Sequence, residues 1–140
     1  MVSADVVAAR VRDELAAAGL PLAPQFTTVD ERFRTGVCVV VEDEGDGVER
    51  VFVSWRTHHT LVGASSRALL RGDAAHPAVM HHGRVCRAVR DAMSEILSSA
   101  GFVVEHADEY NEYRPLELRV SAGPEPYSPA WGDAGDGTGG

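Results

Sequence analysis

Two strand-like segments flank an acidic loop, and this pattern restricts the possible folds more than any other stretch of the chain. Residues 36–41, Gly-Val-Cys-Val-Val-Val, are rich in β-branched side chains, and residues 50–56 alternate polar with apolar side chains. The residues between them, 42–49, contain five carboxylates and two glycines, a composition that suits an exposed turn and not a core. The sequence therefore predicts an antiparallel β-hairpin at residues 36–56.

Both faces of the predicted hairpin carry apolar side chains. One face carries the valines and the tryptophan of the second segment, and the other carries Cys38, Val40 and Phe52. A sheet face open to water would show polar residues at these positions. We therefore expect this second face to be covered, either by a helix of this chain or by a second copy, and the latter possibility predicts a homodimer.

Other segments have the patterns of helices and of further strands. Helices are predicted at 4–18, 60–71 and 77–100, from capping residues, apolar stripes and terminal glycines. Additional strands are predicted at 26–29, 102–106 and 116–121. The order α-β-β-β-α-α-β-β predicts an α+β two-layer sandwich, a largely antiparallel sheet of about five strands with the helices mainly on one face.

The composition of the chain changes at residue 123. Residues 1–122 have the length and the apolar content of a single globular domain. Residues 123–140 are rich in glycine and proline, so the sequence predicts a flexible C-terminal tail. Within this tail, only Tyr127 and Trp131 are large enough to anchor it to another surface.

The chain has thirteen arginines and no lysine, which excludes several reaction classes. Without lysine there is no Schiff base with a carbonyl or pyridoxal substrate and no phosphate-loop lysine. The formal net charge of −8 disfavours nucleic acid as a partner, because nucleic acid is itself a dense anion. No apolar run approaches the roughly 20 residues that cross a bilayer, and no secretory pattern is present. Two scattered cysteines suit a reducing compartment, so we expect a cytoplasmic protein without membrane contact.

The histidines and Cys86 form the most evident candidate for a chemical site. His82 and Cys86 stand one turn apart if this segment is helical, a spacing that binds Zn²⁺ when His58 or His59 supplies further ligands. Basic neighbours in the sequence also suit a reactive Cys86 thiolate. The alternative is that the paired histidines lie on surface loops and that Cys86 packs as a small apolar residue.

No complete catalytic or cofactor-binding signature occurs in the sequence. We therefore expect a non-enzymatic protein-interaction module, a small adaptor, chaperone or assembly component, that uses no cofactor and forms homo-oligomers. Its expected contacts are Cys38, Val40, Phe52, Tyr127 and Trp131. One alternative is a metal-binding or thiol-dependent enzyme or sensor that uses the histidines and Cys86, with zinc as the cofactor. Another alternative is a structural subunit of a phage or mobile element.

Overall fold

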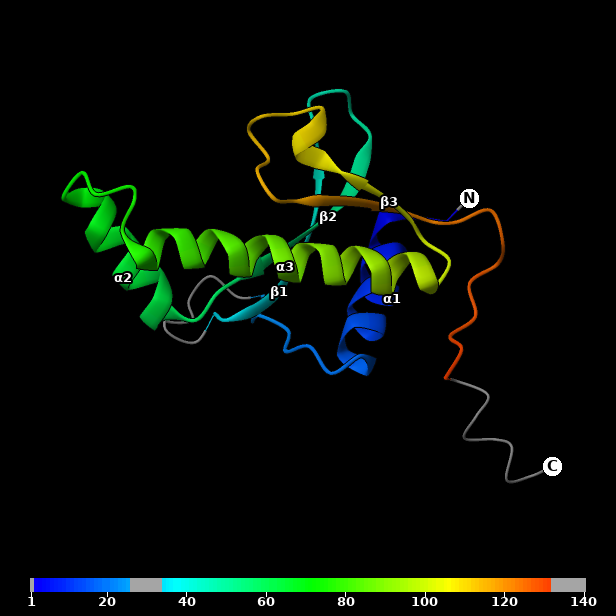
Figure 1. Ribbon diagram of the computed structural model, residues 1–140. Helices are drawn as coiled ribbons and strands as arrows, with labels where there is room; N and C mark the ends of the chain where they lie inside the picture. The colour runs from blue at the N-terminus through cyan, green and yellow to red at the C-terminus, as the bar shows by residue number, and fades with distance from the viewer. Residues whose placement is uncertain (1, 26–33, 132–140) are drawn as a thin grey trace.

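The computed structural model describes residues 2–25 and 34–131. Its elements, shown in Figure 1, are α1 (Ala4–Ala17), β1 (Gly36–Asp43), β2 (Glu49–Arg56), α2 (His59–Leu70), α3 (Pro77–Ser99), β3 (Val103–His106), the 3₁₀ helix η2 (Ala107–Glu109) and β4 (Leu118–Ser121). The described part of the chain is α+β, as predicted, but its sheet has four strands in place of about five. The strand predicted at residues 26–29 lies outside the described residues.

The four strands form one antiparallel sheet in the order β1-β2-β4-β3. β1 and β2 are the predicted hairpin, and their register pairs Val39 with Val53. β4 lies on the other side of β2, where Leu118 also pairs with Val53. Because directly paired residues point to the same face of a sheet, these side chains form one continuous apolar surface.

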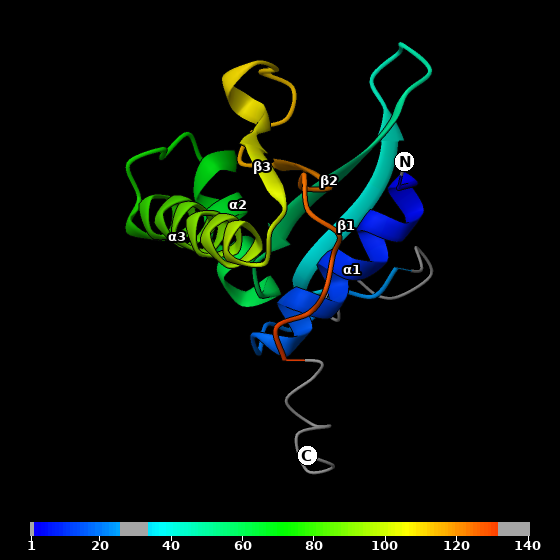
Figure 2. The same cartoon turned by 90° about the vertical axis from the view of Figure 1, so that its right-hand side faces the viewer.

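Helix α1 and the second half of α3 cover this apolar surface (Figures 1 and 2). Ser3 is the N-cap of α1, as predicted: its side chain accepts a hydrogen bond from a backbone N–H in the first turn of the helix. Val11 and Leu15 of α1 meet Met93 and Leu97 of α3 in the core, and all four side chains are fully buried. These helices therefore lie on one face of the sheet, as predicted.

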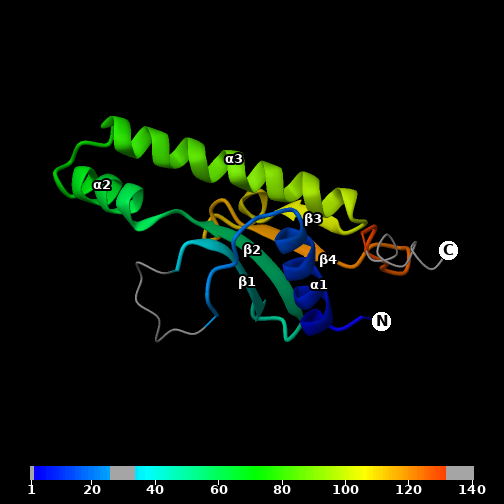
Figure 3. The same ribbon diagram turned by 90° about the horizontal axis from the view of Figure 1, so that it is seen from below.

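Helix α2 and the first half of α3 extend beyond the sheet as a pair of helices (Figure 3), and we call residues 57–88 the helical arm. α2 packs mainly against α3, and its only buried residues are Ser65 and Ala68. The buried residues of α3, Met93 and Leu97, both lie outside the arm. The arm therefore has almost no core of its own.

Candidate interaction surfaces

The second face of the sheet is covered in part by residues 107–117 of the same chain. The guanidinium carbon of Arg114 lies 3.5 Å from the centroid of the Phe52 ring, and Phe52 is only 1% exposed. Arg114 also forms ion pairs with Glu42 at 2.6 Å and with Glu117 at 2.9 Å. Phe52, one of the predicted partner contacts, is thus buried by its own chain, so its burial requires no second copy.

The hairpin tip and the segment that covers Phe52 lie next to each other (Figure 1), and we call residues 42–49 and 107–117 the acidic head. The head contains nine carboxylates and one arginine. Asn111 Nδ2 donates to Glu44 Oε2 at 3.2 Å, which joins the two segments. Ion pairs within the chain neutralise only some of these nine carboxylates.

Four carboxylates of the acidic head are exposed and have no arginine partner within the described ranges: Asp43, Glu49, Glu109 and Glu112. Asp46 differs from them, because Arg50 binds it at 2.6 Å. Hydrogen bonds from Arg50 and from the Val48 N–H lower the pKa of Asp46 from 3.8 to about 2. Asp46 is therefore held in its charged form by Arg50, whereas the four carboxylates without an arginine partner leave unpaired negative charge on the surface of the head.

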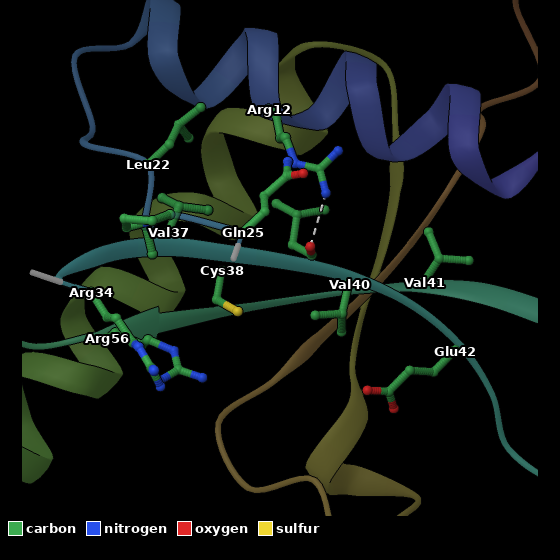
Figure 4. Close-up of a pocket in the computed structure, with 13 residues that line it drawn as sticks. Arg12, Leu22, Gln25, Arg34, Val37, Cys38, Val40, Val41, Glu42 and Arg56 are labelled. Atoms are coloured by element: carbon green, nitrogen blue, oxygen red, sulfur yellow. Dashed lines mark hydrogen bonds between the residues drawn. The ribbon is translucent and has the colours of Figure 1, made fainter. Parts of the chain in front are cut away.

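Cys38 and Val40, which share the second face with Phe52, are half-buried and remain accessible. They line a pocket of about 490 Å³ along the outer edge of β1 (Figure 4). Arg12 of α1 crosses this edge, and its Nη2 donates to the Val39 carbonyl oxygen at 3.0 Å. This bond occupies one acceptor of the edge strand, which limits further strand pairing there. Val40 pairs directly with Phe52, so the predicted contacts on this face are neighbours that differ in exposure: Phe52 is buried, and Cys38 and Val40 are partly accessible.

The first residues of the predicted tail pack against α1. Tyr127 Oη donates to Glu14 Oε1 at 2.6 Å, and Trp131 Nε1 donates to Glu14 Oε2 at 3.3 Å. The Tyr127 ring lies 5.5 Å from the Phe102 ring, measured between centroids. Burial and then the hydrogen bond to Glu14 raise the pKa of Tyr127. Tyr127 and Trp131, two predicted partner contacts, thus attach residues 123–131 to their own domain.

The predicted domain boundary at residue 122 falls where the chain crosses the turn that follows α3. A Cβ atom at Gly123 would overlap the carbonyl oxygen of Gly101, so the crossing requires glycine. Residues 132–140, the remainder of the predicted tail, lie outside the described residues.

Helix α3 brings His82 and Cys86 together, as expected from their spacing. Cys86 Sγ lies 3.5 Å from His82 Nε2 and 3.5 Å from Thr57 Oγ1. His58 and His59 contact each other at the start of α2, with ring centroids 4.2 Å apart, and His58 caps that helix. No three His, Cys, Asp or Glu side chains of the described residues are grouped closely enough to hold a metal ion. The proposed zinc ligands therefore form two separate pairs.

The helical arm exposes large apolar side chains, which the sequence patterns did not reveal. Four such residues are exposed on it: Val62, Leu69, Leu70 and Met80. Leu70 is 87% exposed and Met80 is 50% exposed. Apolar periodicity predicts a helix, but it does not tell which helix packs on the sheet. Large apolar side chains exposed on one pair of helices mark a candidate interaction surface.

The arm is also basic, although the chain as a whole is acidic. It carries four arginines, five of the six histidines and a single carboxylate. The four arginines are all exposed and form no ion pair with another described residue: Arg67, Arg71, Arg84 and Arg87. Four arginines outside the arm do form ion pairs: Arg50, Arg90, Arg114 and Arg119. Charge is thus segregated between the arm and the head, and a count of charges by segment would have detected it.

Comparisons with known proteins give no indication of function, so a proposal must start from the surfaces described above. No helix of the described ranges combines the length and the apolar character needed to cross a membrane. No protein-family model, no curated protein and no solved structure matches this chain.

Proposed function

We propose that this protein is a non-enzymatic interaction protein, a small adaptor, chaperone or assembly component, that binds its partner through the helical arm and needs no cofactor. The observation that carries the proposal is the exposure of Leu70 and Met80, at 87% and 50%, on a helix pair with almost no core of its own. Burial of such a side chain contributes about 1.5–3 kcal/mol. The arginines beside them belong to the residue types that interface centres favour.

The cysteines support a location in the cytoplasm. Cys38 and Cys86 are both free thiols. Unpaired thiols persist in a reducing compartment, whereas secreted proteins of this size often use disulfides. We therefore propose the cytoplasm as the place where the partner is met.

Capture from an extract of the native host tests the proposal. The wild-type chain is compared with the arm variant Leu70→Ser/Met80→Ser and with the control Val6→Ser/Val103→Ser, which changes two exposed valines outside the arm. We expect a specific partner, or a second copy of the chain, to be retained by the wild type and the control and lost from the arm variant. Equal retention by all three folded proteins would contradict the proposal.

The surroundings of Cys86 support a second candidate, a thiol-dependent sensor or enzyme. The His82 ring lies 3.5 Å from the sulfur and is placed to accept its proton, with the Thr57 hydroxyl group at the same distance. This candidate predicts that Cys86 reacts with a thiol reagent faster than Cys38 at neutral pH and that His82→Ala abolishes the difference. Equal rates for the two thiols in the wild type would reject it.

A further inference from the structure

We infer that the helical arm of one copy binds the acidic head of a second copy, so that the chain associates arm to head. The inference rests on the proposed function and identifies the partner of the arm. Two properties of the two surfaces support it, their charges and their exposed apolar side chains, and their places in the molecule determine the kind of assembly.

The charges of the two surfaces are complementary. The arm presents four exposed arginines and the head presents four exposed carboxylates. None of these eight side chains has an ion-pair partner among the described residues. Between separate molecules such charges attract one another within a Debye length, about 8 Å at physiological salt. They also orient the encounter and suppress wrong pairings.

Both surfaces also expose apolar groups. The head exposes Tyr113 (86%), Val48 (53%) and Tyr110 (45%), and the arm exposes Leu70 and Met80 most strongly. Contact between them would remove both apolar sets from water. Aromatic faces of the head also suit arginine, because a guanidinium group stacks on a ring.

This chain already uses arginine–aromatic stacking in two contacts that each include one residue of the head. Arg119 lies 4.5 Å from the Tyr110 ring centroid, and Arg114 lies 3.5 Å from that of Phe52. Tyr113 has no such partner among the described residues, and the arginines of a neighbouring arm would supply one.

Two other partners fit the surfaces less well. Contact between two arms would set arginines against arginines, and like charges that face each other in an interface cost several kcal/mol. Nucleic acid would be attracted by the arm but repelled by the nine carboxylates of the head, on a chain of net charge −8. Neither objection applies to the acidic head of another copy.

The places of the two surfaces determine the kind of assembly. The free end of the arm lies at the left of Figure 1, and the acidic head lies at the top. Contact between two different surfaces is heterologous, so after the first contact the pair keeps one free head, on the copy whose arm is bound, and one free arm, on the other copy. Association therefore continues into an open chain, or closes into a ring if the geometry allows.

Sedimentation velocity of two complementary variants tests the inference. The arm variant is Arg84→Glu/Arg87→Glu, which reverses charges on the helix stripe that contains Met80. The head variant is Glu109→Gln/Glu112→Gln/Tyr113→Ser, which removes exposed groups that make no described ion pair. Leu70→Ser/Met80→Ser serves as a second arm variant, and circular dichroism checks that each protein is folded.

We expect the mass of the wild type to rise with concentration at low salt and to fall back when salt is added. Each variant alone should stay monomeric. An equimolar mixture of arm and head variants should double in mass and grow no further, because the intact arm of one protein binds the intact head of the other and the altered surfaces cannot extend the pair.

Four results would overturn the inference. The first is a mixture that stays monomeric, and the second is a single variant that assembles like the wild type. The third is a wild type that stays monomeric but binds a fluorescent DNA or RNA duplex that the arm variant does not bind, which makes nucleic acid the partner. The fourth is a wild type that stays monomeric but captures from the host extract a different protein that the arm variant does not capture. This result would contradict the inference and leave the proposed function standing.

Discussion

Tyr127 donates a hydrogen bond of 2.6 Å to Glu14, a residue 113 positions earlier in the chain, and this bond fixes the C-terminal segment to α1. Glu14 is 8% exposed, and its second oxygen accepts a hydrogen bond from Trp131. A buried carboxylate requires such donors, because loss of its hydration is costly. The segment that composition predicts to be a free tail is therefore part of the folded domain up to Trp131.

Replacement of Glu14 should destabilise the protein through this contact. Glu14→Ala leaves the Tyr127 hydroxyl and the Trp131 indole N–H without their acceptor, and we expect the free energy of unfolding to fall by about 2 kcal/mol. Truncation after Ala122 should cause a similar loss, and the two changes together should not add, because both remove the same contact. Urea denaturation measures all three proteins. Full additivity would show that the tail and Glu14 stabilise the fold independently.

The raised pKa of Tyr127 predicts a loss of stability at alkaline pH. Burial and the hydrogen bond to Glu14 raise this pKa above the ordinary value of 10.0, so the unfolded chain loses the proton first as pH rises. The stability that Tyr127 contributes is present below pH 10 and is lost as pH rises above it. Urea denaturation at a series of pH values should give a smaller alkaline loss for Tyr127→Phe than for the wild type. The control Tyr113→Phe should behave as the wild type does.

Part of this alkaline loss should persist in every variant, because burial also raises the pKa of Tyr110. Identical pH profiles for the wild type and Tyr127→Phe would mean that the tail contact does not form in solution.

Removal of Arg114 should uncover Phe52. The Arg114 side chain is 14% exposed and combines the contact with Phe52 with ion pairs to Glu42 and Glu117. We expect Arg114→Ala to lower the free energy of unfolding by about 2 kcal/mol and to increase binding of a dye that reports exposed apolar surface. Arg71→Ala, at an exposed arginine of the arm, is the matched control and should change stability by less than about 0.5 kcal/mol. Equal effects would refute the structural role of Arg114.

Replacement of two glycines by alanine should change the stability of the protein in opposite directions. Gly36 has a φ of +129°, and a Cβ there would lie 2.5 Å from the Pro21 carbonyl oxygen, which accepts the Val37 N–H. Gly36→Ala should therefore destabilise the protein by about 2 kcal/mol. Gly83 lies inside α3 beside a flexible arginine side chain, so Gly83→Ala should stabilise the protein by up to about 1 kcal/mol. Thermal or urea denaturation measures the change in stability of each variant.

The hairpin and the helices could be predicted because their signals are local. Apolar spacing, capping residues and terminal glycines lie within a few residues of the elements that they define. The predicted start of the last strand is an instructive error. β4 begins at Leu118 and not at Leu116, because Leu116 adopts a φ of +59° and leaves the extended conformation. Alternation of apolar residues does not report such a local change of backbone.

The surfaces were less predictable because they depend on contacts between distant segments. Strand alternation indicates that Phe52 is covered, but no sequence pattern identifies Arg114 as the residue that covers it. Similarly, Glu14 lies in a polar position of a helical repeat, and nothing in the sequence pairs it with Tyr127. The basic character of the arm is different, since its charges are visible in the sequence but are concealed by a net charge of −8.

Hydroxyl-radical footprinting of Leu70 and Met80 tests most directly whether the arm is the contact surface. The chain is labelled in an extract of its native host and as isolated protein at low concentration, with the exposed Val6 of α1 as an internal reference. We predict that Leu70 and Met80 are labelled less in the extract, while labelling of Val6 is unchanged. Equal labelling of the two arm residues in both samples would contradict the assignment of the arm as the surface through which this protein works.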